Sequence, residues 1–152
     1  MRIILVALLS MTFLLNACTS SDSKEGSYTV EPAEKQVVSI TDTKWELFTL
    51  GGEEVGEVSE RGNPNLTLDT TENRAYGFGG CNSFNGSFTL GDDYALKFSQ
   101  MASTKMYCAE SMAVEDAFMP IFEAVASYEI SGDQLHLKSE DGEVLAVFVV
   151  AG

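Results

Sequence analysis

The segment from Gly77 to Gly86 gathers residue types that often carry chemistry. It reads GFGGCNSFNG and holds four of the 13 glycines, one of the three cysteines and no charge. A glycine-rich turn can hold phosphate, but Asn82 occupies the third glycine position of the dinucleotide pattern and no Gly-Lys-Ser/Thr follows. Cys81 as a nucleophile would need a base, and His136 is the only histidine. We therefore interpret the segment as a structural corner, because glycine and asparagine permit sharp turns.

The histidine and the methionines offer two further possibilities for chemistry. His136 alternates with leucines on both sides, which favours a strand that points the imidazole toward solvent. A soft-metal site for copper would use thioether and thiol donors, here Met101, Met106, Cys108, Met112 and Met119. Methionines at such positions more often fill gaps in a core, and we favour that interpretation. The sequence therefore predicts no catalytic residue, no metal site and no cofactor.

Cys18 presents a different kind of thiol chemistry. It follows Arg2 and an apolar run from Ile3 to Leu15, which is shorter than the roughly 20 residues needed to span a bilayer. A run of this length is typical of a signal peptide. The ending Leu-Asn-Ala-Cys resembles a bacterial lipobox, in which the cysteine receives a diacylglycerol and cleavage occurs just before it. We predict a signal peptide over residues 1–17 and lipidation of Cys18; the alternative is an ordinary signal peptide with a chance cysteine.

The rest of the chain divides into a polar segment and one small domain. Residues 18–40 are rich in Ser, Glu and Lys and show little hydrophobic periodicity, so we expect a flexible tether. Residues 41–152 are long enough for a single core. The whole chain carries nine Lys or Arg against 23 Asp or Glu, a net charge of −14. This balance argues against nucleic-acid binding, which uses clustered basic residues to neutralise phosphates.

Short alternating patterns predict that the domain consists mainly of strands. We expect a strand over Thr43–Leu50 and a loop over Gly51–Asn65. Hairpins should turn near Thr71–Asn73, near Gly91–Asp93, at Ser131–Asp133 and at Asp141–Gly142, and the last apolar strand should lie centrally in the sheet. The period changes over Ser111–Tyr128, which predicts one helix with Ser111 as its N-cap and Glu115 favourably placed near its N-terminus. Pro120 should kink or split that helix.

A single antiparallel sheet of this many strands tends to curl. The predicted fold class is therefore mainly β (α+β), a curled antiparallel sheet or partly open β-barrel capped by one helix at about Ser111–Tyr128. At this level the chain resembles the META/HslJ domain family of small bacterial envelope proteins. The matching residues, in family order, are Trp45, Leu47, Gly80, Cys81, Asn82, Phe84, Gly86, Thr104, Met106 and Cys108. The resemblance implies a similar fold and a link to stress resistance, but no agreed activity.

The cysteine count then suggests a disulfide. If Cys18 carries lipid, two cysteines remain in an exported chain, and both Cys81 and Cys108 stand where the family carries cysteine. We predict that they pair and tie the glycine corner to the start of the helix. The alternative is two reduced, buried cysteines.

Three hypotheses for function follow from these patterns. The first is a non-enzymatic, lipid-anchored protein of the bacterial cell envelope, in the outer membrane facing the periplasm or at the cell surface. It would bind an envelope protein or stabilise the envelope under stress. The second is a carrier of a small apolar ligand in a barrel cavity. The third is a hydrolase or protease inhibitor that uses carboxylates, which the sequence disfavours because its acidic residues lie in loops and turns such as Glu53, Glu54, Asp92, Asp93 and Asp141.

Overall fold

A computed structural model describes residues 38–152. Cys18, the predicted signal peptide and most of the predicted tether lie outside these residues. Residues 38–40, which the sequence assigns to the tether, belong to the domain: Ile40 is buried and its carbonyl accepts a hydrogen bond from the Trp45 indole at 2.9 Å. The domain therefore begins a few residues before Thr41.

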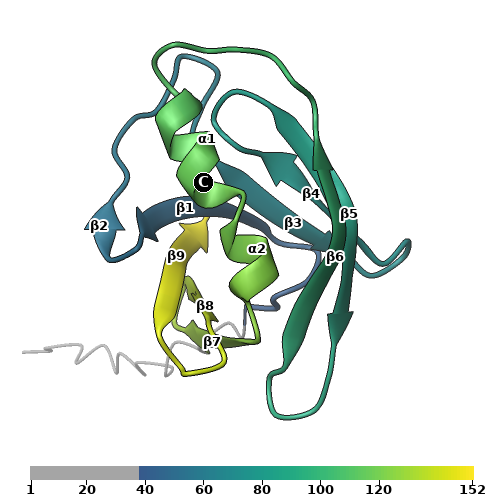
Figure 1. Ribbon diagram of the computed structural model, residues 1–152. Coiled ribbons are helices and arrows are strands. Elements are labelled where there is room, and N and C mark those ends of the chain that lie inside the picture. Colours follow the sequence, from purple (N-terminus) through teal and green to yellow (C-terminus); the bar gives the residue numbers. More distant parts are fainter. Residues whose placement is uncertain (1–37) are drawn as a thin grey trace, which may run out of the picture. The chain divides into compact units, whose positions relative to one another are not determined.

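The described residues form a mainly β domain with two short helices between its sixth and seventh strands (Figure 1). The elements in chain order are β1 Lys44–Leu50, β2 Glu53–Glu54, β3 Asn65–Asp69, β4 Arg74–Phe78, β5 Ser83–Leu90, β6 Leu96–Ser103, α1 Met112–Phe118, α2 Ile121–Ala124, β7 Ser127–Ser131, β8 Gln134–Lys138 and β9 Val144–Val150.

All strand pairs are antiparallel, and eight strands follow the order β6-β5-β4-β3-β1-β9-β8-β7, with β2 paired to β1 beside this path. The sheet curls so that its two edge strands approach each other. Ala95, just before β6, forms an isolated bridge with Ser127 of β7. The predicted fold class, a curled sheet or partly open barrel, is confirmed, and β9 lies inside the sheet as expected.

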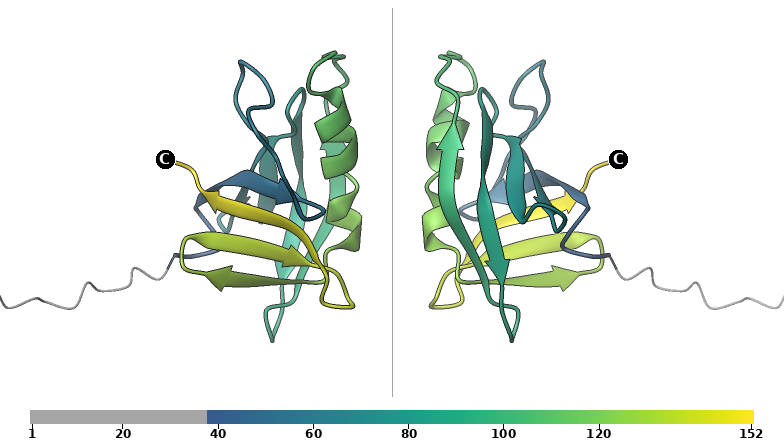
Figure 2. Two further views of the ribbon diagram at one scale, coloured as in Figure 1. Left: turned by 90° about the vertical axis from the view of Figure 1, so that its left-hand side faces the viewer. Right: turned by 90° about the vertical axis from the view of Figure 1, so that its right-hand side faces the viewer.

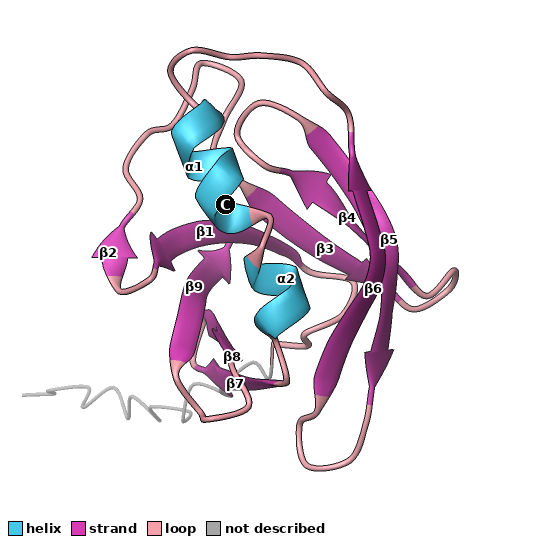
Figure 3. Ribbon diagram, in the orientation of Figure 1, coloured by secondary structure: helices cyan, strands magenta, loops and turns pink. Residues whose placement is uncertain are grey.

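The helical region differs from the prediction in its length. Pro120 divides it into α1 and α2, and α2 ends at Ala124 (Figure 3). A proline has no backbone N–H and its ring clashes with the preceding turn, which explains the break. Val125 is already extended, and Ser127 and Tyr128, predicted to be helical, pair with Lys138 and Leu137 in the sheet. The expected break at Pro120 is therefore confirmed, whereas the predicted end of the helical region at Tyr128 is wrong.

Aromatic side chains fill the concave side of the sheet. Side views show α1 and α2 along one side of the curled strands (Figure 2). Phe118 of α1 and Phe122 of α2 are buried, and their ring centroids lie 5.1 Å apart. Phe84 lies 5.9 Å from Phe118 and 5.1 Å from Phe122, and Phe148 of β9 lies 6.0 Å from Phe118. Edge-on and tilted rings at these separations form a packed core rather than an open interior.

Candidate functional site

The glycine corner between β4 and β5 encloses a buried carboxylate from α1. Gly80 has φ +114°, a conformation that favours glycine. The turn directs the backbone N–H groups of Cys81 and Asn82 at Glu115 Oε2, with N···O distances of 3.0 and 2.6 Å. Glu115 is only 3% exposed. The backbone N–H groups of the corner therefore bind the carboxylate of Glu115 and not a phosphate group.

The side chain of Asn82 links three segments. Its Nδ2 donates to Glu115 Oε1 at 2.7 Å and to the carbonyl of Met106 at 3.1 Å. Its Oδ1 accepts hydrogen bonds from Thr104 Oγ at 2.9 Å and from the backbone N–H of Met106 at 2.7 Å. All four hydrogen-bonding positions of the amide are therefore used, and the residues of two family segments converge on one buried group.

A disulfide joins Cys81 to Cys108, the pair that the cysteine count predicts, with 5.7 Å between the Cα atoms. It connects the glycine corner to the segment just before α1. Because Cys81 is oxidised and buried, it offers no thiolate for nucleophilic attack. The corner is held covalently on one side and by hydrogen bonds to Glu115 on the other.

The remaining motif residues also serve the fold. Trp45 and Leu47 are buried in the core, and Phe84 packs against the helix aromatics. Gly86 lies opposite an irregularity in β6: a Cβ there would meet the carbonyl oxygen of Ser99 at 2.9 Å. The shared residues therefore support one another, and the structure brings all of them except Trp45 and Leu47 to the corner, the strand that leaves it or the segment that covers it.

Sequence reasoning missed Glu115 as the centre of this cluster. It placed Glu115 near the helix N-terminus only for its interaction with the helix dipole. Two features of the sequence carry the signal: Phe118 and Phe122, three and seven residues later, place Glu115 on the apolar face of the helical segment. Ser111 occupies the N-cap position but its side chain makes no capping bond.

The other candidate groups do not converge on a reactive centre. His136 is half-buried on β8, with Nε2 3.3 Å from Gln134 Oε1. Within residues 38–152, no three His, Cys, Asp or Glu side chains are placed to hold a metal. Met106, Met112 and Met119 line one hollow of about 630 Å³ beside Asn82, whereas Met101 lies against Gly86 and Cys108 is oxidised. The soft-metal set is therefore divided.

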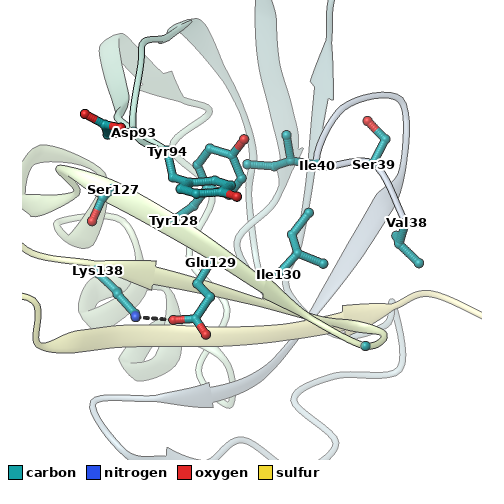
Figure 4. A pocket seen from close by; sticks show the side chains of 11 residues that line it. Val38, Ser39, Ile40, Asp93, Tyr94, Ser127, Tyr128, Glu129, Ile130 and Lys138 are labelled. Carbon is teal, nitrogen blue, oxygen red and sulfur yellow. Dashed lines mark hydrogen bonds and ion pairs between the residues drawn. The ribbon is translucent and has the colours of Figure 1, made fainter. Parts of the chain in front are cut away.

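A pocket of about 790 Å³, the Tyr94 pocket, lies between the turn after β5, strand β7 and residues 38–40 (Figure 4). The rings of Tyr94 and Tyr128 pack edge to face, 5.6 Å apart. Tyr94 has φ +60°, unusual for a bulky residue, and its carbonyl accepts a hydrogen bond from the Tyr128 N–H at 3.0 Å. Lys138 pairs with Glu129 on the same side, so the pocket has apolar walls and both signs of charge.

A second hollow, the acidic groove, has a volume of about 580 Å³. It runs between residues 50–58 and residues 110–121, the loop and helix that lie next to each other in Figure 1. Its lining consists of glycines, alanines and half-buried aliphatic side chains, together with Glu53, Glu54, Glu57 and Glu110. No lysine or arginine lines it.

Among the described residues, neither helix is long or apolar enough to cross a membrane.

The chain matches no curated protein. It does resemble solved structures. One from Burkholderia xenovorans, determined by NMR, is 25% identical, with a TM-score of 0.58, over 86% of this chain and 98% of that one. A second NMR structure is 19% identical, with a TM-score of 0.58, over 74% of this chain and 95% of that one.

A third is a DUF4847 family protein from Bacteroides vulgatus, 12% identical, with a TM-score of 0.51, over 72% of this chain and 93% of that one. These likenesses agree with the curled sheet described above. The model of the META domain matches residues 38–151, which is most of the chain and includes every motif residue from Trp45 to Cys108. The chain belongs to the META domain family.

Proposed function

We propose that this protein is a non-enzymatic lipoprotein of the bacterial cell envelope, anchored through Cys18, whose META domain acts by binding a protein partner. The observation that carries the binding role is the filled interior. Aromatic rings from β5, β9, α1 and α2 occupy the space that a barrel carrier would leave for its ligand. The accessible hollows lie instead on the surface, where a partner can reach them.

The way in which the motif uses its polar groups supports the non-enzymatic part of this proposal. Glu115 and Asn82 are both buried and hydrogen-bonded to each other and to the backbone, so neither side chain is accessible to a substrate. The carboxylates elsewhere that the sequence analysis considered, among them Glu53 and Asp92, are exposed.

The envelope location rests on the sequence. Leu15–Cys18 supplies the lipobox-like site, and Thr19 stands where enteric bacteria place an aspartate for retention in the inner membrane. This favours the outer membrane, with the domain facing the periplasm.

The anchor is tested by changing Cys18 to Ala. We expect the variant to lose fatty-acid labelling and to leave the membrane fraction, because the thiol that accepts the lipid is gone. Ser20→Ala, two residues away, is the matched control and should remain labelled and membrane-bound. A wild-type protein that is never labelled, or a Cys18→Ala variant that still carries lipid, would contradict the anchor.

The binding role is tested separately by crosslinking the lipidated protein in its own envelope and identifying what it captures. Capture of one defined protein partner that remains crosslinked after stringent washing supports the proposal. Recovery of the protein alone at every crosslinker length contradicts it.

A specific observation also favours a second candidate, the binding of a small apolar molecule. The Tyr94 pocket exceeds the lower limit of about 300 Å³ for ligand sites, and its lining includes Val38, Ile40, Tyr94 and Ile130. Native mass spectrometry of protein purified from its envelope would reveal a bound small molecule. Its loss on Tyr94→Ala would favour this candidate over a protein partner.

A further inference from the structure

The acidic groove has a floor that remains partly open to solvent. Five apolar side chains form this floor, and each is only half-buried. Leu50, Val55 and Val58 come from one side of the groove, and Val114 and Ile121 come from the other. Apolar surface gathered in a concavity gains free energy when a partner's apolar side chains displace the water. The floor therefore suits apolar side chains, but on its own it does not specify their source.

The rim of the groove supplies the charge that selects a partner. Glu53, Glu54 and Glu57 lie along the loop wall, and Glu110 precedes the helix wall. Within residues 38–152 the ion pairs are Arg74–Glu72 and Lys138–Glu129, so none of the four rim glutamates is paired there. Four like charges around an apolar floor repel one another and attract a partner that carries lysine or arginine beside apolar residues.

The surroundings strengthen this selection. The described residues contain 19 Asp or Glu against six Lys or Arg, a net charge of −13. A cationic segment is attracted over a long range, whereas an anionic lipid surface or nucleic acid is repelled. The Tyr94 pocket differs, because Lys138 contributes a positive charge to its lining.

The helix wall indicates which shape of segment fits. Ala113 and Ala117 are exposed, lie one turn apart and line the groove, so their small side chains permit the close approach of another helix. The helix wall consists of α1, which is about 10 Å or roughly two turns long, and of Ile121, the first residue of α2 after the break at Pro120. Helices that dock in grooves present apolar residues at three- and four-residue spacing, which a floor of this length accommodates.

We propose that the acidic groove binds a cationic amphipathic helix of a partner protein. Apolar side chains of that helix pack against the floor, which includes Leu50, Val55, Val114 and Ile121. Its lysines or arginines form ion pairs with the rim glutamates. The inference rests on the proposed binding function and names the partner's chemistry, but it does not depend on the lipid anchor.

The test uses the full-length protein in mild detergent and a synthetic 14-residue helical peptide with leucines at i, i+4 and i+7 and lysines on the flanks of that stripe. Binding is measured by fluorescence anisotropy of the labelled peptide. We expect saturable binding that Glu57→Gln/Glu110→Gln weakens about 10-fold or more, because one charge is removed from each wall. Glu140→Gln/Glu143→Gln, which removes two exposed charges from the turn before β9, should change Kd less than about twofold.

Two further measurements separate groove docking from general attraction. A peptide of the same composition with its leucines and lysines scrambled should bind at least 10-fold more weakly. Ala117→Phe, which fills the groove without changing charge, should abolish binding while the far- and near-ultraviolet circular dichroism stays unchanged.

An equal loss of affinity in both glutamine pairs, equal binding of the scrambled peptide, or no saturable binding would overturn the groove as a docking site. If crosslinking in the envelope still captures a protein partner, the proposed binding function stands and only its assignment to this groove fails. If no partner is captured although the groove binds the peptide, the binding function fails and the chemistry of the groove stands.

Discussion

The side chain of Glu115 connects α1 to the corner before β5. It is a carboxylate on a short helix, it is nearly inaccessible, and it receives three hydrogen bonds from two consecutive residues of the corner before β5. Two of these come from backbone N–H groups, which would have no partner in a buried turn without it. Glu115 therefore determines where α1 lies against the corner.

Replacing Glu115 with Ala should destabilise the domain by about 3 kcal/mol, because three buried donors lose their acceptor at once. Glu115→Gln should cost less, since the amide oxygen still accepts from the backbone while the amide nitrogen opposes Asn82 Nδ2. Urea unfolding measures both changes. The neighbouring Asp116 is exposed, and Asp116→Ala should shift stability by no more than about 0.5 kcal/mol. Equal effects of the two alanine variants would contradict this role.

The surface pair Lys138–Glu129 gives a pH-dependent prediction. The hydrogen bond from Lys138, and then its charge, lower the pKa of Glu129 below its ordinary value. A lowered carboxyl pKa means that the pair contributes above the unfolded-state pKa and that this contribution is lost as the pH falls through the folded-state pKa.

In Lys138→Met we expect the Glu129 pKa to rise toward its ordinary value, measured by carbon-detected NMR titration of the carboxyl group. Lys97→Met, an exposed lysine outside the pair, should leave it unchanged. A Glu129 titration that is identical in wild type and Lys138→Met would show that the ion pair does not persist in solution.

At the residue scale, the predictions succeed where a residue type has few possible partners or conformations. Once Cys18 is assigned to the proposed lipid, only two cysteines remain, and their pairing is the one disulfide they can form; Gly80 likewise predicts a turn, because few other residues adopt its positive φ. The buried position of Glu115 could not be predicted in this way, because hydrophobic periodicity counts apolar side chains and treats a carboxylate as solvent-exposed. Asn82 was understood as a turn residue, although its decisive property is an amide that bonds on both sides.

At the scale of elements, the period of the sequence predicts where helix replaces strand but not where the helix ends. Val125, Ser127 and Tyr128 continue the helical spacing, yet the chain is extended from Val125 onward. Pairing of β7 with β8 outweighs local helical preference, because it satisfies a row of backbone groups and places Tyr128 against Tyr94. Such long-range pairing is invisible in a single segment.

The disulfide joins the corner before β5 to the segment before α1, and its two cysteines are 27 residues apart in the sequence. Reducing it should lower the free energy of unfolding by about 3–4 kcal/mol, because the unfolded chain regains the freedom of that loop. Thermal melts with and without reductant measure the loss. The double variant Cys81→Ala/Cys108→Ala should melt at a lower temperature and respond to reductant no further, whereas an unchanged melting temperature on complete reduction would contradict this contribution.

At the scale of the whole domain, the curled sheet could be predicted because its cause is general: many short antiparallel strands twist and a helix covers the concave side. The way the curl closes could not. It involves the bridge between Ala95 and Ser127 and the packing of Tyr94 on Tyr128, residues that no local pattern connects. Most of the residues that carry the family resemblance, all except Trp45 and Leu47, belong to one interconnected corner and the segments next to it.

The charge of the domain gives a prediction at this scale. With a net charge of −13 over residues 38–152, repulsion between carboxylates opposes folding. Raising NaCl from 10 mM to 200 mM shortens the screening length from about 30 Å to less than 10 Å and should therefore raise the melting temperature. Glu140→Gln/Glu143→Gln should reduce this dependence on salt. A melting temperature that falls with added NaCl would show that favourable ion pairs dominate instead.

The position of β9 between β1 and β8 has a consequence for the order in which the protein can fold. β9 follows every other strand of the domain in the sequence, yet it joins the first strand of the sheet to the β7–β8 hairpin. Without β9, the other strands form two sheet fragments that no strand unites. The sheet can therefore be completed only once β9 is available, and a truncation before Val144 removes an interior strand of the sheet.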